Sequence, residues 1–176
     1  MDIEKLKFPI GKFSPLDSYT KNDIGSYISD LEIIPSQFRK EVENLSDEQL
    51  DTPYRPDGWT IRQVIHHIPD SHMNAFVRFK RTLTEDSPTI SPYFEERWAE
   101  LPDAKLPVGV SLSLIEAIHR RWTLLLKALN RKDFEKKYIH PEYKKTFVLN
   151  EALHMYSWHG KHHLAHITEL KKKMGW

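Results

Sequence analysis

The chain has 176 residues, of which 39% are hydrophobic and 29% charged, a composition typical of one globular domain rather than a disordered chain. Its formal net charge is +1, so it lacks a basic field for nucleic acid, and no apolar run is long enough to span a membrane. It has no cysteine, which excludes disulfides, thiolate nucleophiles and cysteine-ligated metal sites. Because no secretory signal is visible either, we expect a cytoplasmic protein with a single domain over residues 1–176.

Apolar residues recur at helical spacing in four stretches of the sequence. These stretches run from about Asn22 to Leu45, Thr60 to Leu83, Ser113 to Leu129 and Asn150 to Lys173. Pro35 lies inside the first and should kink it. Four long amphipathic helices in one domain predict an all-α four-helix bundle.

Sequence patterns also mark the ends of these helices. Thr60 with Gln63, and Ser113 with Glu116, form capping-box patterns at the starts of the second and third. Gly175 follows the basic last turn of the fourth, where a C-terminal cap is expected.

Two connections are long. Residues 1–21 are expected to wrap the bundle. Residues 85–110 form a proline-rich connection that includes the aromatic residues Tyr93, Phe94 and Trp98. Such a loop is either a lid over a functional site or an aromatic cover for the bundle end, and the sequence favours neither. Strand patterns are weak, although Lys137–Val148 could hold a short hairpin.

Histidine is the unusual residue, with ten copies, five of them between His154 and His166. His159 and His163 fall in the middle of the apolar face of the fourth predicted helix, one turn apart. Two imidazoles buried side by side need polar partners, and protonating both would bury like charges. A divalent cation would take a lone pair from each ring. The His-x-x-x-His spacing therefore favours a metal site over a pair of hydrogen-bonded core histidines.

The other histidines of this helix are weaker candidates. His162 lies toward the flank of the apolar stripe, and we expect it in solvent. His166 also lies toward the flank and could border the site, whereas His154 lies off the stripe and is assigned no role. A third ligand must then come from another helix.

The second predicted helix offers three histidines for that role. His66 points away from the apolar face, and we expect it in solvent. His72 lies within the apolar stripe and His67 on its flank. Helical phase does not choose between them, because Pro69 interrupts the hydrogen-bond ladder at this point.

The same helix contains the string WTIRQVIHHIPDS (Trp59–Ser71), which resembles the opening helix signature of the DinB/YfiT-like proteins. In that signature a tryptophan precedes a metal-binding histidine by eight positions, and the matching position here is His67. The fourth helix contains WHGKHHLAHI (Trp158–Ile167), which resembles the family's His-x-x-x-His element. That element maps onto His159 and His163.

The resemblance extends over nearly the whole chain. The string FPIGKF near the start and the stretch Pro92–Ala104 are both similar to the YfiT branch of the family. One departure is His166, which stands where many relatives carry glutamine.

The resemblance implies a bundle with up-down-down-up connections and one divalent ion per chain, with zinc or nickel first among the candidates. It implies that His67, His159 and His163 hold this ion and leave positions open for water or substrate. It also implies a homodimer. Many family members are named as metal-dependent hydrolases, and others use bacillithiol or mycothiol as transferases or isomerases. The YfiT branch is similar to bacillithiol S-transferases.

The same site could support two reactions, because an ion held by three neutral imidazoles keeps its charge and an open position. Water bound to such an ion has a pKa of roughly 7, and a coordinated thiol loses its proton. The HExxH motif of metallopeptidases is missing, since Gly160 follows His159. No nucleophile elbow and no P-loop occur, and no general base is evident.

Three hypotheses follow, and in each the catalytic residues beyond the metal ligands are unknown. The first is a metal-dependent S-transferase that joins a low-molecular-weight thiol, most simply bacillithiol, to an electrophile. The second is a metal-dependent hydrolase of a small substrate, and the third is a non-enzymatic, metal-binding stress protein. None involves nucleic acid or a membrane.

Further candidates are named by their proximity to these motifs. The thiol's carboxylates would need cationic partners, and the candidates are Arg62, Arg78, Arg97 and Lys161. Residues that could orient the imidazoles are Asp70, Ser71 and Glu151, none of which can be assigned.

Overall fold

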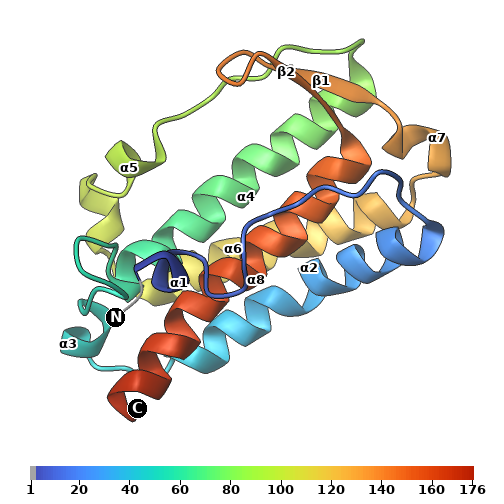
Figure 1. Cartoon of the computed structure of the whole chain (residues 1–176). Coiled ribbons are helices and arrows are strands. Elements are labelled where there is room, and N and C mark those ends of the chain that lie inside the picture. Colours follow the sequence, from blue (N-terminus) through green and yellow to red (C-terminus); the bar gives the residue numbers. More distant parts are fainter. Residues whose placement is uncertain (1–2) are drawn as a thin grey trace.

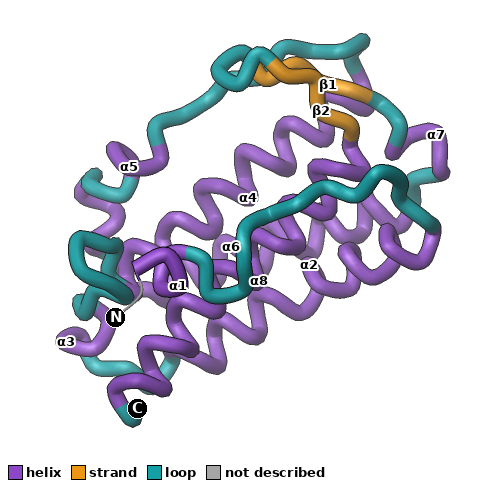
Figure 2. The backbone as a smooth tube through the Cα atoms, viewed as in Figure 1, coloured by secondary structure: helices purple, strands orange, loops and turns teal. Residues whose placement is uncertain are grey.

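The computed structural model describes residues 3–176, and four long helices dominate it (Figures 1 and 2). The long helices are α2 (Lys21–Val42), α4 (Ile61–Thr84), α6 (Val108–Lys127) and α8 (Leu149–Met174). The short helices are α1 (Ile3–Lys7), α3 (Asp47–Leu50), α5 (Glu95–Trp98), the 3-10 helix η1 (Pro102–Lys105) and α7 (Arg131–Phe134). The predicted four-helix bundle is confirmed.

The predicted hairpin is also present. Strands β1 (Lys137–His140) and β2 (Lys145–Val148) pair antiparallel, with Lys137 opposite Val148. The hairpin lies between α7 and α8, at the end of the bundle where α8 begins (Figure 1).

The long helices pack in a ring in which α2 and α4 each contact both α6 and α8. In Figure 1, α4 and α6 run in one direction and α2 and α8 in the other, which is the up-down-down-up order. Because α4 and α6 are parallel neighbours, the chain must return along the bundle between them. The 24 residues of α4 span about 36 Å at about 1.5 Å per residue, which explains the length of the connection over residues 85–107.

Apolar side chains from all four long helices form the core, and α8 packs tightly on α2 at a glycine. A Cβ added at Gly160 would lie 2.4 Å from Cδ1 of Ile34. Gly160 lies between His159 and His163 in α8. The missing side chain therefore lets the histidine-bearing turn of α8 pack directly on α2.

The helix starts agree with the predicted caps at α4 but not at α6. At α4 the Thr60 side chain accepts from the backbone N–H of Gln63, and the Gln63 side chain accepts from the backbone N–H of Thr60. Helix α6 begins at Val108 and contains Ser113, whose hydroxyl donates to the Gly109 carbonyl. The predicted start and capping box at Ser113 were therefore wrong.

Pro107 explains why α6 begins before the predicted start at Ser113. Its φ of −55° is close to the helical value, and it directly precedes the first helical residue. At the other end of the chain the predicted cap is confirmed, because Gly175 adopts the left-handed conformation with φ of 75°.

Two prolines lie inside long helices without ending them. Helix α2 continues through Pro35 and α4 through Pro69. Proline has no backbone N–H, so the carbonyl four residues before it loses its helical donor. For Pro35 this carbonyl belongs to Leu31, which is fully buried.

The N-terminal segment crosses the bundle, as expected of residues 1–21, of which residues 1 and 2 lie outside the described part. The Lys7 carbonyl lies 3.1 Å from Nε2 of His166, and Phe13 packs on the rings of His154 and Trp158. This segment therefore covers one side of α8 (Figure 1).

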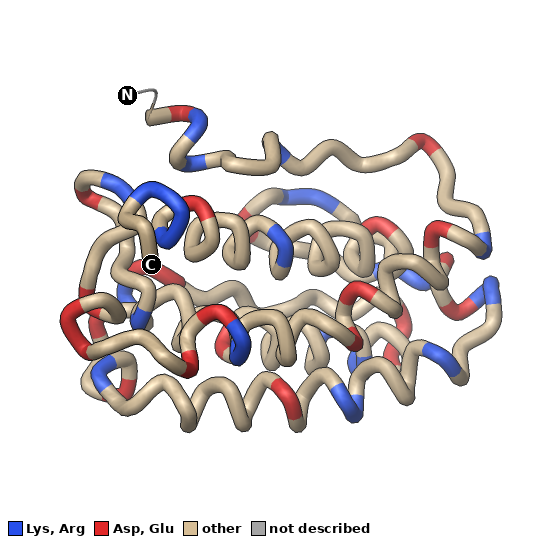
Figure 3. The backbone as a smooth tube through the Cα atoms, turned by 90° about the horizontal axis from the view of Figure 1, so that it is seen from below, with Lys and Arg blue, Asp and Glu red and all other residues tan. Residues whose placement is uncertain are grey.

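The helices of residues 3–176 are all too short or too polar to cross a bilayer. Figure 3 shows Lys and Arg interspersed with Asp and Glu along the helices. This mixture agrees with the formal net charge of +1.

Candidate metal centre

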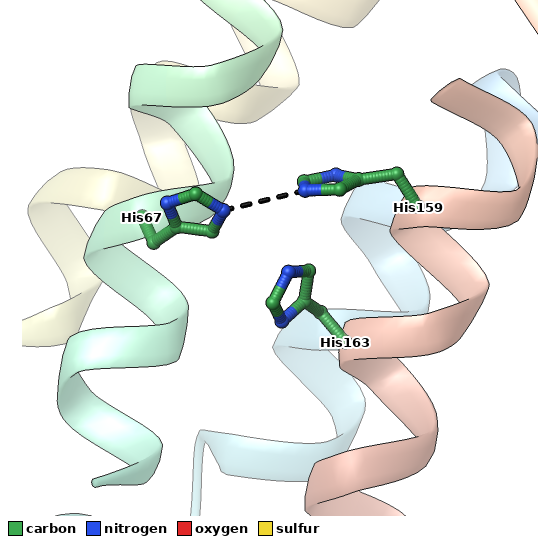
Figure 4. A group of neighbouring side chains, drawn as sticks. All are labelled: His67, His159 and His163. Carbon is green, nitrogen blue, oxygen red and sulfur yellow. Dashed lines mark hydrogen bonds between the residues drawn. The ribbon is translucent and has the colours of Figure 1, made fainter. Parts of the chain in front are cut away.

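Three predicted ligands meet between α4 and α8. His67 extends from α4, and His159 and His163 extend from successive turns of α8, so that the three rings point toward one another (Figure 4). One ring nitrogen from each residue lies within 4.8 Å of the others. Nε2 of His67 is 3.3 Å from Nε2 of His159. This spacing allows three imidazoles to face one ion.

The three imidazoles are neutral. Burial lowers the pKa of His67 to about 4, and desolvation, with the neighbouring imidazoles, lowers the pKa of His159 and His163 well below the usual value. The buried Nδ1 of His163 has no hydrogen-bond partner among the described residues. The Nδ1 atoms of His140, His162 and His166 are unpartnered in the same way, so this feature does not by itself distinguish a metal ligand. Three neutral imidazole nitrogens that lie close together fit a divalent ion such as zinc or nickel.

The tryptophan that precedes α4 closes one side of this cluster. The Trp59 ring lies 4.7 Å from the ring of His67 and 6.3 Å from that of His163, measured between centroids. Its indole therefore shields two of the three imidazoles from water.

The structure distinguishes between His67 and His72, the two α4 histidines between which helical phase could not choose. His67 belongs to the group that could hold an ion, whereas His72 lies behind His159. Nε2 of His72 is 3.1 Å from Nδ1 of His159, and its Nδ1 is 2.8 Å from Nε2 of His119 in α6. His119 was missed by the sequence analysis. A signal was present, because it lies four residues after Ile115 and three before Trp122, on the apolar stripe of α6.

Two expectations of solvent exposure were wrong. His66 is buried, with Nδ1 2.7 Å from the Ser111 hydroxyl and Nε2 2.9 Å from the Leu106 carbonyl. His162 is also buried, stacked on Trp158 with ring centroids 4.5 Å apart. Helical phase assumes one buried face per helix, but the chain before α6 covers a second face of α4 and the N-terminal segment covers a second face of α8.

The two remaining histidines of α8 have their own partners. His166 stacks on Tyr54 at 3.9 Å between centroids, and it borders the cluster because its ring lies 5.4 Å from that of His163. His154 stacks on Tyr27 at 4.5 Å, away from the cluster.

Of the four candidate cations, three are already engaged or exposed. Arg62 pairs with Asp47 and Asp51, and Lys161 pairs with Asp30. Arg97 is exposed and lies over the Phe94 ring.

Arg78 differs from these three. Its guanidinium donates to the Tyr156 hydroxyl at 3.0 Å and to the Ser91 carbonyl at 3.3 Å. Its Nε is buried without a partner, and no carboxylate of residues 3–176 lies within ion-pair distance. The Arg78 side chain is partly buried and has no carboxylate partner among these residues, so it is the candidate able to receive an anion.

Among the described residues, no hydrogen bond or ion pair joins a candidate orienting residue to the three imidazoles. Glu151 pairs with Lys145, and Ser71 is buried in α4. Asp70 is half-buried, and desolvation, with a smaller contribution from Asp103, raises its pKa to about 6.

Comparison with known proteins gives one consistent family. The model of the DinB superfamily matches residues 30–167. A protein of Bacillus cereus (strain 03BB102), named "Putative metal-dependent hydrolase", is 51% identical over 174 residues, which cover 99% of this chain and 100% of that protein. A protein of Bacillus thuringiensis subsp. konkukian (strain 97-27) with a similar name is also 51% identical over the same share of both chains.

Solved structures agree. One is the structure of YfiT from Bacillus subtilis, described as "a probable metal-dependent hydrolase with an unusual four-helix bundle topology". It has a TM-score of 0.95 and 47% identity to this chain, and the match covers 98% of this chain and 99% of that one. A mycothiol-dependent maleylpyruvate isomerase has a TM-score of 0.62 at 15% identity, covering 82% of this chain and 63% of that one. The second likeness shows a common fold alone.

Proposed function

The chain belongs to the DinB superfamily, and we propose that it is a metal-dependent enzyme whose divalent ion is held by His67, His159 and His163. The observation that carries this proposal is the convergence of three neutral, largely buried imidazoles on one point. We propose zinc or nickel as the ion, because both accept nitrogen donors of this kind. When bound, such an ion lowers the pKa of a water or thiol at its open position.

The reaction we propose is S-transfer from a low-molecular-weight thiol, with bacillithiol as the candidate. The thiol sulfur forms a bond to the electrophilic carbon, the leaving group departs with the electron pair of its own bond, and the thiol proton is released. The absence of a glutamate after His159 supports transfer over peptidase chemistry, since no carboxylate follows the histidine to act as base.

The protein's own residues bind and shield the reactants in this proposal. Trp59 excludes water from the side of His67 and His163. Arg78, which has no carboxylate partner among residues 3–176, receives a carboxylate of the thiol. It lies on the same face of α4 as His67, three turns further along, at about 16 Å by helical rise. A thiol with an extended acidic part could reach both residues.

A second candidate is hydrolysis of a small substrate, which the names of the 51% identical relatives favour. The two reactions differ in their need for a thiol. Transfer consumes an electrophile only when thiol is present, whereas hydrolysis releases an acid, alcohol or amine without it.

The test is elemental analysis of untagged protein combined with an assay of bacillithiol and 1-chloro-2,4-dinitrobenzene on the same sample. We expect one divalent ion per chain, and conjugate formation that is lost on chelation and restored by metal. One ion per chain without conjugation, but with thiol-independent hydrolysis of ester or amide substrates, would favour the second candidate. Light scattering and cell fractionation test the proposed homodimer and cytoplasmic location.

A further inference from the structure

A proline in α2 leaves a buried carbonyl without its helical partner. The Leu31 carbonyl would accept from residue 35, but Pro35 has no N–H. Leu31 is 0% exposed, so water cannot replace the missing donor. His119 of α6 supplies it, because its Nδ1 hydrogen bonds to this carbonyl.

The carbonyl determines the direction of the next hydrogen bond. A carbonyl oxygen only accepts, so Nδ1 of His119 carries the hydrogen. A neutral imidazole has one donor and one acceptor, and Nε2 of His119 is therefore the acceptor. It lies 2.8 Å from Nδ1 of His72, which must donate.

The same reasoning reaches the candidate metal centre. Because His72 donates through Nδ1, its Nε2 accepts, and this atom lies 3.1 Å from Nδ1 of His159. Nδ1 of His159 therefore donates, and its Nε2 keeps a lone pair. That Nε2 is the atom 3.3 Å from His67, on the side where the three rings meet.

The chain of hydrogen bonds requires neutral rings. His72 is 0% exposed and His119 1% exposed, and among the described residues no hydrogen bond or ion pair joins either ring to a carboxylate. An extra proton would place two donors face to face. Burying such a charge without a counter-ion is costly, so the neutral arrangement is favoured.

We infer that the Leu31 carbonyl, His119 and His72 form a positioning chain that fixes His159 as its Nδ1–H tautomer and directs its Nε2 lone pair at the metal. This inference rests on the proposed metal site. His72 and His119 are positioning residues, because they act through His159. A partner on the second ring nitrogen typically fixes the tautomer and orientation of a metal-binding histidine. Here that partner is His72, which is held in turn by His119 and the Leu31 carbonyl, whose helical donor is missing because residue 35 is proline.

The first experiment reads the tautomers directly. Long-range ¹H–¹⁵N correlation spectra of the metal-free full chain, with assignment by single histidine variants, distinguish a protonated from an unprotonated ring nitrogen. We expect His72, His119 and His159 each to carry hydrogen on Nδ1. Hydrogen on Nε2 of His119 or His159 would overturn the inference, whatever the protein does with metal.

The second experiment compares zinc affinity, measured by competition with a chromophoric chelator, in two variants of one position. His119→Phe removes both ring nitrogens, and we expect zinc to bind about 10-fold more weakly. His119→Gln keeps an amide oxygen that can accept from His72 and an N–H that can donate to Leu31, so it should restore most of the affinity.

The control is His66→Gln. His66 is another buried histidine with two hydrogen bonds, and neither belongs to the positioning chain. It should leave zinc affinity unchanged. Equal affinity in folded His119→Phe and the wild type would overturn the inference. A wild-type protein that binds no zinc would instead count against the proposed metal site, and the tautomer spectra would still decide the positioning chain.

Discussion

Two neighbouring regions of the bundle interior differ in how their imidazoles are satisfied. In the supporting region, His72 and His119 have a partner for every ring nitrogen. In the metal-facing region, formed by His67, His159 and His163, Nδ1 of His163 has no partner among the described residues. The rings of the metal-facing region instead turn nitrogens toward one another.

The difference shows what to look for in a buried polar cluster. A histidine with both nitrogens paired is accounted for by the protein alone, whereas three imidazoles that turn one nitrogen each toward a common point fit an ion from outside it. Distance alone does not distinguish the two regions, since His159 contacts both. They are distinguished by what each ring nitrogen faces.

The largest expected effect comes from removing a ring of the metal-facing region. His163→Ala should abolish stoichiometric zinc binding and thiol transfer, because two imidazoles hold a divalent ion poorly. Metal analysis after dialysis and the conjugation assay measure both effects. A folded His163→Ala protein that keeps one tightly bound ion per chain would show that this histidine is not a ligand.

A smaller effect is expected from the supporting region. His72→Phe leaves Nδ1 of His159 without its acceptor, and zinc affinity should fall about 10–100-fold while one ion still binds at saturation. Calorimetric titration distinguishes weaker affinity from lost stoichiometry. If His72→Phe lost stoichiometric binding as fully as His163→Ala, the distinction between the two regions would fail.

A third variant tests the anion partner, outside both regions. Arg78→Gln should raise KM for bacillithiol about 10-fold, the loss of one charge-assisted interaction, and leave zinc affinity unchanged. The matched control is 2-mercaptoethanol, which has no carboxylate and should show equal KM values with the wild type and the variant. An equal rise in KM for both thiols would mean that Arg78 does not bind the carboxylate.

Because both regions contain buried histidines, we expect the stability of the metal-free protein to fall in acid. Burial lowers the pKa of His67 and His119 from 6.5 to about 4, so below about pH 6.5 the unfolded chain binds protons that the folded chain does not. Stability should therefore fall as the pH drops from about 6.5 toward 4. Thermal unfolding at a series of pH values measures this, and a flat Tm across that window would contradict the neutral, buried state of these rings.

The smallest effect is expected at the start of the positioning chain. Pro35→Ala returns a backbone N–H that competes with His119 for the Leu31 carbonyl. Zinc affinity should weaken a few-fold, less than in His119→Phe, while Tm is unchanged or higher because alanine favours helix. Lower Tm with unchanged affinity would indicate that Pro35 serves packing alone.

Much of the fold follows from sequence because its signals are local. Apolar periodicity locates all four long helices, and the predicted ends of α4 and α8 lie within one residue of those in the structure. The start of α6 was misplaced because a plausible cap at Ser113 competes with the proline that precedes the true start. The connection over residues 85–107 could be recognised as long, but its packing on α4 is a tertiary property.

The site residues also differ in whether a local sequence signal identifies them. Helical phase alone turns His159 and His163 inward, and His67 follows only from the resemblance to a family. His66 and His162 were misplaced because segments distant in sequence cover them. The link from Leu31 to His119 joins residues 88 positions apart, so no local pattern could reveal it.

X-ray absorption spectroscopy of the untagged protein reconstituted with one equivalent of zinc tests the central claim most directly. We expect three imidazole nitrogens at about 2.0–2.1 Å from zinc and solvent oxygen at the remaining position. Addition of bacillithiol should replace this oxygen with one sulfur at about 2.3 Å. A spectrum without imidazole scattering, or a folded protein that retains no zinc, would contradict the assignment of His67, His159 and His163 as its ligands.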